Sequence, residues 1–157
     1  SGLAYHVKCM LNLAEKVCEV YPDLNSDLLY AGVILHDIGK VIELKQSPAN
    51  EYTKEGKLIG HVAISYSEII KIASELKIED TEEVLVLSHM ILAQHGKLEY
   101  GSPIIPMIKE AEILSLIDLI DSRVAIMRKA IKDVEKGEFT DKIFGMDGRN
   151  LYNHKIE

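Results

Sequence analysis

An apolar segment that ends in a histidine and an aspartate constrains the fold of this chain most. Residues 27–35 (DLLYAGVIL) are apolar nearly all round, which is typical of a helix buried among other helices. His36 and Asp37 follow at once. Neighbours on a regular helix point about 100° apart, so we expect Gly39 to supply the bend that lets both side chains face one ion. Taken alone, such a pair is more often a core histidine beside a helix-terminal aspartate.

Size and composition limit the classes of protein to consider. A chain of 157 residues suffices for one domain with a real core. It has neither the roughly 18 consecutive apolar residues of a membrane span nor a signal-peptide pattern, so we expect a cytoplasmic protein without membrane contact. Cys9 and Cys18 lie on one predicted helix without a bridging partner and are interpreted as buried thiols.

The net charge of −7 argues against a long basic nucleic-acid groove built by this domain alone. A nucleotide site remains open, because two divalent ions would add four positive charges locally.

Apolar residues recur at helical spacing along most of the sequence. With Asn25 or Ser26 and Thr81 as N-caps, the pattern predicts main helices over 3–20, 27–37, 82–95 and 106–134, and a further one that starts between 56 and 60 and ends at 76. Residues 41–44 predict a short helical turn, 46–52 a polar loop that could edge a substrate site, and 139–157 a mostly irregular tail. The expected fold is all-α: one domain over 1–157, a bundle of about five main helices plus short helices.

Ionisable side chains interrupt these core-forming helices, usually near their ends. Buried ionisable groups cost several kcal/mol unless they are paired or bind metal, so this many indicates a shared task. Imidazole and carboxylate without cysteine favour manganese, iron, zinc or magnesium over a structural zinc. The set is His6, His36, Asp37, His61, His89, His95, Asp118 and Asp121.

The order of these residues carries a resemblance. An early histidine, a His-Asp pair, further histidines and a late aspartate resemble the HD-domain metal-dependent phosphohydrolase superfamily. Within it, the chain is similar to the HD domain of YhaM-type 3′→5′ exoribonucleases over nearly its whole length. The similar stretches include 3–7, 27–44 (DLLYAGVILHDIGKVIEL), 60–61, 95–97, 100–103, 108–114 and 137–140.

The resemblance implies roles for the candidate residues. Asp37 would bridge two ions, which could clamp a phosphate between them. Lys40 would steady that phosphate beside Asp37, and Lys97 is a second candidate for this contact. Asp121 would either orient a ligand from outside the coordination shell or be only a capped polar residue on its helix. The implied ligands are His6, His36, Asp37 and Asp118 for one ion, and Asp37, His61, His95 and, as a further candidate, His89 for the other.

The same resemblance implies the function and the partners. The expected enzyme releases 5′-nucleotides from single-stranded RNA, and DNA is another candidate substrate. It is expected to use one or two divalent ions. Manganese is the first candidate, and the alternatives are iron, magnesium, nickel, cobalt and zinc. An oligonucleotide-binding OB domain precedes the HD domain in that family and is absent here, and homo-oligomers stay open.

Gln94 stands where that family usually has the first of two adjacent histidines. Two alternatives therefore stay open: a mononucleotide phosphohydrolase, and a nucleotide-binding regulatory module that no longer turns over.

Overall fold

The computed structural model describes residues 2–45 and 51–156. Their Cα atoms group into two compact units, Ser1–Asp118 and Leu119–Glu157, each described here by itself. The polar loop predicted at 46–52 lies mostly outside the described residues, because 46–50 are not among them.

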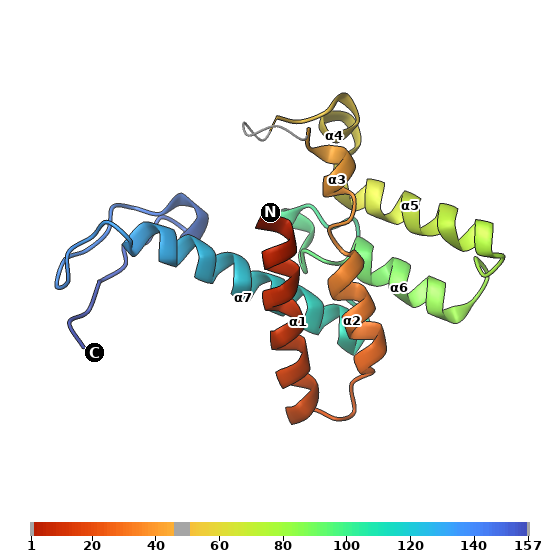
Figure 1. Ribbon diagram of the computed structural model, residues 1–157, viewed down its shortest axis with the longest axis horizontal. Helices are drawn as coiled ribbons and strands as arrows, with labels where there is room; N and C mark the ends of the chain where they lie inside the picture. The colour runs from red at the N-terminus through yellow and green to blue at the C-terminus, as the bar shows by residue number, and fades with distance from the viewer. Residues whose placement is uncertain (1, 46–50, 157) are drawn as a thin grey trace. The chain divides into compact units, whose positions relative to one another are not determined.

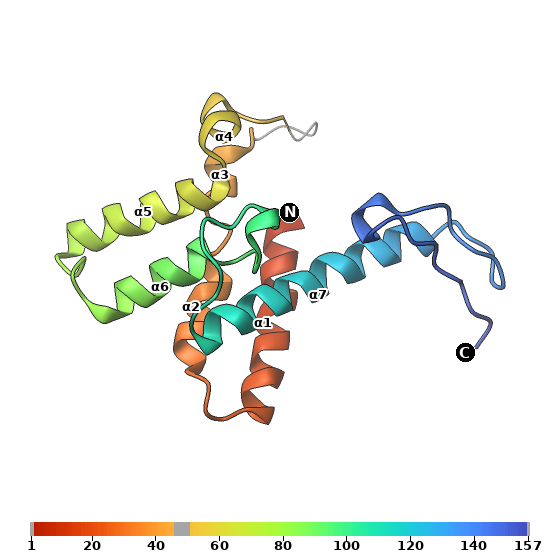
Figure 2. The same cartoon turned by 180° about the vertical axis from the view of Figure 1, so that it is seen from behind.

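The first unit is built from helices, as the sequence predicts. Figure 1 shows α1 and α2 as an antiparallel pair and α5 and α6 as another, and the view from behind in Figure 2 agrees. The 3-10 helix η1 (Leu98–Tyr100) follows α6. The α-helices that begin in this unit are α1 (Gly2–Val20), α2 (Ser26–Leu35), α3 (Lys40–Glu43), α4 (Lys54–Ile59), α5 (His61–Leu76), α6 (Glu82–Leu92) and α7 (Lys109–Ile131).

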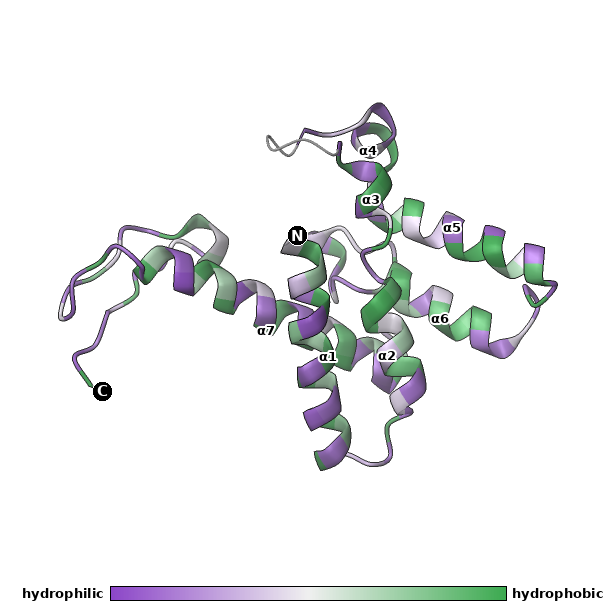
Figure 3. Ribbon diagram, in the orientation of Figure 1, coloured by the Kyte–Doolittle hydropathy of each residue, from purple (hydrophilic) through white to green (hydrophobic). Residues whose placement is uncertain are grey.

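The core of this unit gathers apolar side chains from four helices. Met10, Leu29, Met90 and Leu114 are fully buried and belong to one cluster. Hydrophobic and hydrophilic positions alternate along α1, so one side of that helix faces the cluster (Figure 3). The predicted caps are confirmed, because the side chains of Asn25 and Thr81 accept backbone N–H groups of α2 and α6.

The helix predicted to start between 56 and 60 and to end at 76 begins at His61 and ends at Leu76, and a separate short helix, α4, precedes it. The two are separated by Gly60. Its φ of +78° lies in the region that favours glycine, which ends α4 at Ile59 and starts α5 at His61. The consequence for the site is that His61 becomes the first residue of a helix rather than a residue inside one.

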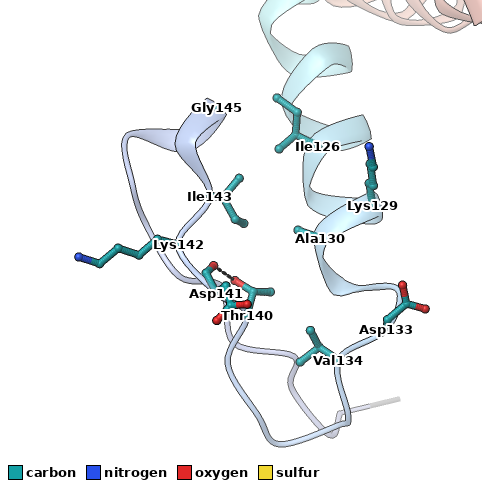
Figure 4. A pocket seen from close by; sticks show the side chains of 10 residues that line it. All are labelled: Ile126, Lys129, Ala130, Asp133, Val134, Thr140, Asp141, Lys142, Ile143 and Gly145. Atoms are coloured by element: carbon teal, nitrogen blue, oxygen red, sulfur yellow. Dashed lines mark hydrogen bonds between the residues drawn. The ribbon is translucent and has the colours of Figure 1, made fainter. Parts of the chain in front are cut away.

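The second unit holds the end of α7, the 3-10 helix η2 (Phe144–Met146) and a tail less irregular than predicted. Two antiparallel bridges, Phe139 with Tyr152 and Ile143 with Arg149, fold the tail back on itself. A cavity of about 630 Å³ lies between Ile126 and Ala130 of α7 and Ile143 of the tail (Figure 4). No predicted site residue lines it.

The described residues contain no regular strand, which confirms the all-α prediction. Among the described helices, none combines the length and the apolar character that a membrane crossing requires.

Candidate metal centre

The centre is organised by the turn that ends α2. His36 is the C-cap residue, its backbone N–H donates to the carbonyl of Gly32 at 2.8 Å, and the side chains of His36 and Asp37 are almost completely buried. His36 Nδ1 donates to the carbonyl of Val33 at 2.9 Å. This bond places the ring proton on Nδ1, which leaves the Nε2 lone pair available to a cation.

Gly39 does not act in the way the sequence analysis expected. Its φ is −62°, an ordinary helical value, so the turn requires no special backbone freedom. The reason for glycine is space: an added Cβ would lie 2.3 Å from the carbonyl oxygen of His61 and 2.8 Å from the backbone nitrogen of Ser65. The turn therefore lies directly against the first turn of α5, and this contact holds His36 and His61 on neighbouring elements.

Ser65 fastens this contact. Its hydroxyl accepts the N–H of Gly39 at 2.8 Å and donates to the carbonyl of His36 at 3.1 Å, and the residue is fully buried. Both functions of one hydroxyl are used to tie the turn to α5.

One group of candidate ligands converges in front of the turn. One ligand atom each from His6, His36 and Asp37 lies within 4.8 Å of the other two. His6 Nε2 lies 3.2 Å from Asp118 Oδ1, and His36 Nε2 lies 3.4 Å from Asp37 Oδ2. The rings of His6 and His36 meet edge to face, with their centroids 5.5 Å apart. Residues from α1, from the turn after α2 and from α7 thus share one small volume.

A second group lies on the other side of the same carboxylate. His61 Nε2 is 3.6 Å from Asp37 Oδ1, and the rings of His61 and His95 are 5.4 Å apart. Within the described residues, the buried Nε2 atoms of His36 and His61 and the buried Nδ1 of His95 have no hydrogen-bond partner. Buried polar atoms are normally satisfied, so these three orphaned nitrogens fit a site that receives a cation.

The electrostatics keep the ligands in the forms that bind metal. Burial raises the pKa of Asp37, but hydrogen bonding and charge from His36, which act when both of its ring nitrogens are protonated, and from Lys40 outweigh burial and hold that pKa well below its usual range. The contribution of Lys40 remains when His36 is neutral. Lys40 Nζ donates to Asp37 Oδ2 at 2.6 Å. Burial, assisted by the charge of His61, lowers the pKa of His95. Near neutral pH the centre therefore presents an ionised carboxylate and a neutral imidazole.

Two predicted site residues, His89 and Lys97, make other contacts, and a third, Asp121, belongs to the other unit. His89 Nε2 accepts the backbone N–H of Met107 at 2.9 Å, so that nitrogen is already used. Lys97 is exposed, lies 3.5 Å from Glu99 and stands over the ring of Tyr100. Asp121 belongs to the second unit, on the part of α7 that follows Asp118, and is half-buried there.

Glu43 and Ser65 also support the centre, although they were not among the residues predicted from the sequence. Glu43 Oε1 accepts both the backbone N–H and the Nδ1–H of His61, at 3.0 and 3.1 Å. The sequence did contain a signal, because Glu43 is the one charged residue of the otherwise apolar stretch 41–44, where a carboxylate needs a partner if it is buried. Ser65 gave no comparable signal, since serine is common on helices.

Comparisons with known proteins agree with this geometry. The family model of the HD domain matches residues 3–123. The chain belongs to the HD domain family. It is 54% identical over 157 residues to "3'-5' exoribonuclease YhaM" of Listeria welshimeri, covering all of this chain and 50% of that protein. It is also 55% and 53% identical over 152 residues to proteins of the same name from Bacillus licheniformis and Bacillus subtilis, covering 97% of this chain and 48% of each.

The chain spans about half the length of the curated relatives it matches. No solved structure gave a significant match.

HD domains bind divalent metals, and the residues of this HD domain fit such an ion. The donors are imidazole nitrogens and carboxylate oxygens, a mixed set suited to first-row divalent cations. When bound, the ion supplies a Lewis acid that polarises a phosphoryl oxygen. The chain itself holds the ring proton of His36 on Nδ1, keeps Asp37 ionised and places the Nε2 atoms of His36 and His61 beside the two oxygens of that carboxylate.

Proposed function

We propose that this chain is the catalytic domain of a metal-dependent phosphodiester hydrolase, a 3′→5′ exoribonuclease that releases 5′-nucleotides from single-stranded RNA. The observation that carries the proposal is the convergence of His6, His36 and Asp37 ligand atoms within 4.8 Å. The substrate class follows from relatives named 3'-5' exoribonuclease, which are more than half identical over nearly the whole chain.

In this proposal Asp37 is shared between two ions, because candidate ligands approach both of its oxygens. His6, His36 and Asp118 complete the first site. His61 and His95 complete the second, where their orphaned nitrogens support the assignment. His89 is left out, because Met107 already uses its Nε2.

Two lysines are proposed as phosphate contacts. The side chain of Lys40 is 35% exposed while its ammonium touches the buried Asp37, so it spans the boundary between the centre and solvent, where a phosphate would arrive. Lys97 is exposed on η1's N-terminal side and is a weaker candidate, because it pairs with Glu99. Asp121 is proposed to orient a ligand from outside the coordination shell.

The acidic charge of −7 supports a division of labour over the full-length protein. We propose that residues 1–157 form one domain that hydrolyses the phosphodiester bond. We further propose that an OB domain, in the part of the relatives which this chain does not cover, binds the RNA. Manganese is the proposed native ion and the cytoplasm the proposed compartment, and the homo-oligomeric state is left to measurement.

One observation favours a second candidate, a nucleotide-binding module that no longer turns over. Gln94 is 1% exposed, and neither atom of its amide has a hydrogen-bond partner within the described residues. An amide binds a divalent ion less strongly than an imidazole, so the second site could be impaired at this position.

The test uses 5′-labelled single-stranded RNA, the chain and Mn²⁺. The proposal expects a ladder of strands shortened from the 3′ end, and loss of that ladder in Asp37→Asn. The matched control is Asp80→Asn, which changes an exposed aspartate in the same way. Mononucleotide hydrolysis without a ladder would favour a nucleotidase, and metal binding without any hydrolysis would favour the regulatory module.

A further inference from the structure

Glu43 is a buried carboxylate that the proposed chemistry does not use. It is 7% exposed and ends α3. One of its oxygens, Oε1, accepts two hydrogen bonds, and both come from His61: one from the backbone N–H at 3.0 Å and one from Nδ1 at 3.1 Å. A single carboxylate oxygen therefore holds both the backbone and the ring of the same residue.

The two bonds fix which nitrogen of His61 can bind a cation. A carboxylate can only accept, so Nδ1 carries the proton and Nε2 keeps the lone pair. Because the backbone bond anchors the start of the side chain and the ring bond anchors Nδ1, the ring is held with Nε2 turned toward Asp37 Oδ1, 3.6 Å away. That Nε2 is buried and has no hydrogen-bond partner within the described residues.

Glu43 is itself held in place by its surroundings. Its carbonyl oxygen accepts the backbone N–H of Thr53 at 2.9 Å and the hydroxyl of Thr53 at 3.2 Å. The helix α4 lies so close that a Cβ on Gly56 would approach the same carbonyl oxygen to 2.3 Å. The backbone that carries Glu43 thus has little freedom, as a support for a metal ligand requires.

From this geometry we infer that Glu43 is the positioning residue of the second metal site: it selects the tautomer of His61 and orients its Nε2 toward the bridging carboxylate. The inference rests on the proposed function for the presence of a second ion. A purely structural role would need only the backbone bond, which caps the first N–H of α5. The bond to Nδ1 has no such use and serves the ring alone.

The main experiment compares Mn²⁺ binding to the full chain in Glu43→Ala, Glu43→Gln and the control Glu55→Ala by calorimetry. Glu55 is exposed and also precedes α5. Removal of a partner behind a ligating histidine typically costs 10–100-fold in affinity. We expect Glu43→Ala to weaken one of two ions by about that factor and the other less than twofold, Glu43→Gln to keep most of the affinity because its amide oxygen accepts the same bonds, and Glu55→Ala to match wild type.

A second measurement does not depend on metal. The ¹⁵N chemical shifts of the His61 ring report its tautomer, and we expect the Nδ1–H form in wild type and Glu43→Gln and a mixture in Glu43→Ala. Should Glu43→Ala fail to fold, Glu43→Asp takes its place in both measurements, because the shorter side chain moves the carboxylate away from His61 by the length of one methylene group. Ring shifts in Glu43→Ala that equal those of wild type, or an equal loss of both ions in Glu43→Ala, would overturn the inference.

The two measurements also separate this inference from the proposed function. A wild-type chain that binds no Mn²⁺ or cuts no RNA contradicts the proposed function, whereas the ring shifts of His61 still decide the role of Glu43.

Discussion

Substituting Gly39 by alanine tests the close contact between the turn of His36 and Asp37 and the first turn of α5. An ideal Cβ at this position would lie 2.3 Å from the carbonyl oxygen of His61, whereas ordinary contacts begin at 3.4 Å, so the turn would have to move by about 1 Å. The opposing atoms are mainly backbone, which cannot rotate away as the end of a side chain could.

The expected cost follows from two losses. Overpacking of a well-packed site costs about 1–3 kcal/mol, and the buried bond from the Gly39 N–H to Ser65 Oγ adds about 1 kcal/mol when it is stretched. The free energy of unfolding should therefore fall by about 2–4 kcal/mol, which corresponds to a decrease in Tm of roughly 5–15 °C for a chain of this size.

Urea denaturation followed by far-UV circular dichroism measures the loss. The control is Gly2→Ala, since nothing lies within 4 Å of a Cβ there, and we expect no destabilisation from it. Gly39→Asn distinguishes crowding from a backbone bend that requires glycine. If the bend were the reason, asparagine would be tolerated better than alanine, because asparagine adopts left-handed conformations more readily. If crowding is the reason, asparagine is at least as destabilising as alanine. Stability of Gly39→Ala equal to that of the control would refute the reasoning.

Three further predictions concern other parts of the first unit. His89→Ala should lower stability by about 1 kcal/mol in thermal denaturation, because the N–H of Met107 loses its acceptor, while the number of Mn²⁺ ions bound stays as in wild type; a lost ion would return His89 to the ligand set. Asn25→Ala should cost about 1 kcal/mol in the same assay, since the N-cap of α2 is lost, and an unchanged Tm would contradict the role of the cap. Burial, with a smaller effect of Glu110, raises the pKa of Cys18, so its alkylation by iodoacetamide, followed by mass spectrometry, should reach half its maximal rate at higher pH than in the unfolded chain.

Residue patterns that act locally could be read from the sequence. The caps Asn25 and Thr81 were predicted because a short polar side chain before an apolar periodic stretch satisfies the first N–H groups of a helix. The all-α class followed from the same periodicity, which spans most of the chain. The His36 and Asp37 pair was recognisable because two ionisable residues followed an apolar helix.

The features that the sequence did not predict depend on contacts between distant segments of the chain. The reason for Gly39 lies in the carbonyl of His61, 22 residues further along, and glycine at a close approach looks the same in sequence as glycine in a bend. The start of the long helix was expected between 56 and 60, but the separate helix α4 was not predicted, because the apolar period continues across Gly60. The type of His89 and its position on α6 made it a further candidate ligand in the sequence, and only the fold shows that the backbone N–H of Met107 is bound to its Nε2.

The hydroxyl of Ser65 leaves almost no choice of residue at its position. It donates one bond and accepts another with no exposed surface, so alanine would leave two partners without a bond, threonine would add a methyl group at a fully buried position, and cysteine would replace both bonds with weak ones. His61 and Ser65 stand four residues apart and share a face of α5. A histidine followed by serine at the fourth position, downstream of a His-Asp-x-Gly motif, is therefore a compact search pattern for other chains that fasten this turn in the same way.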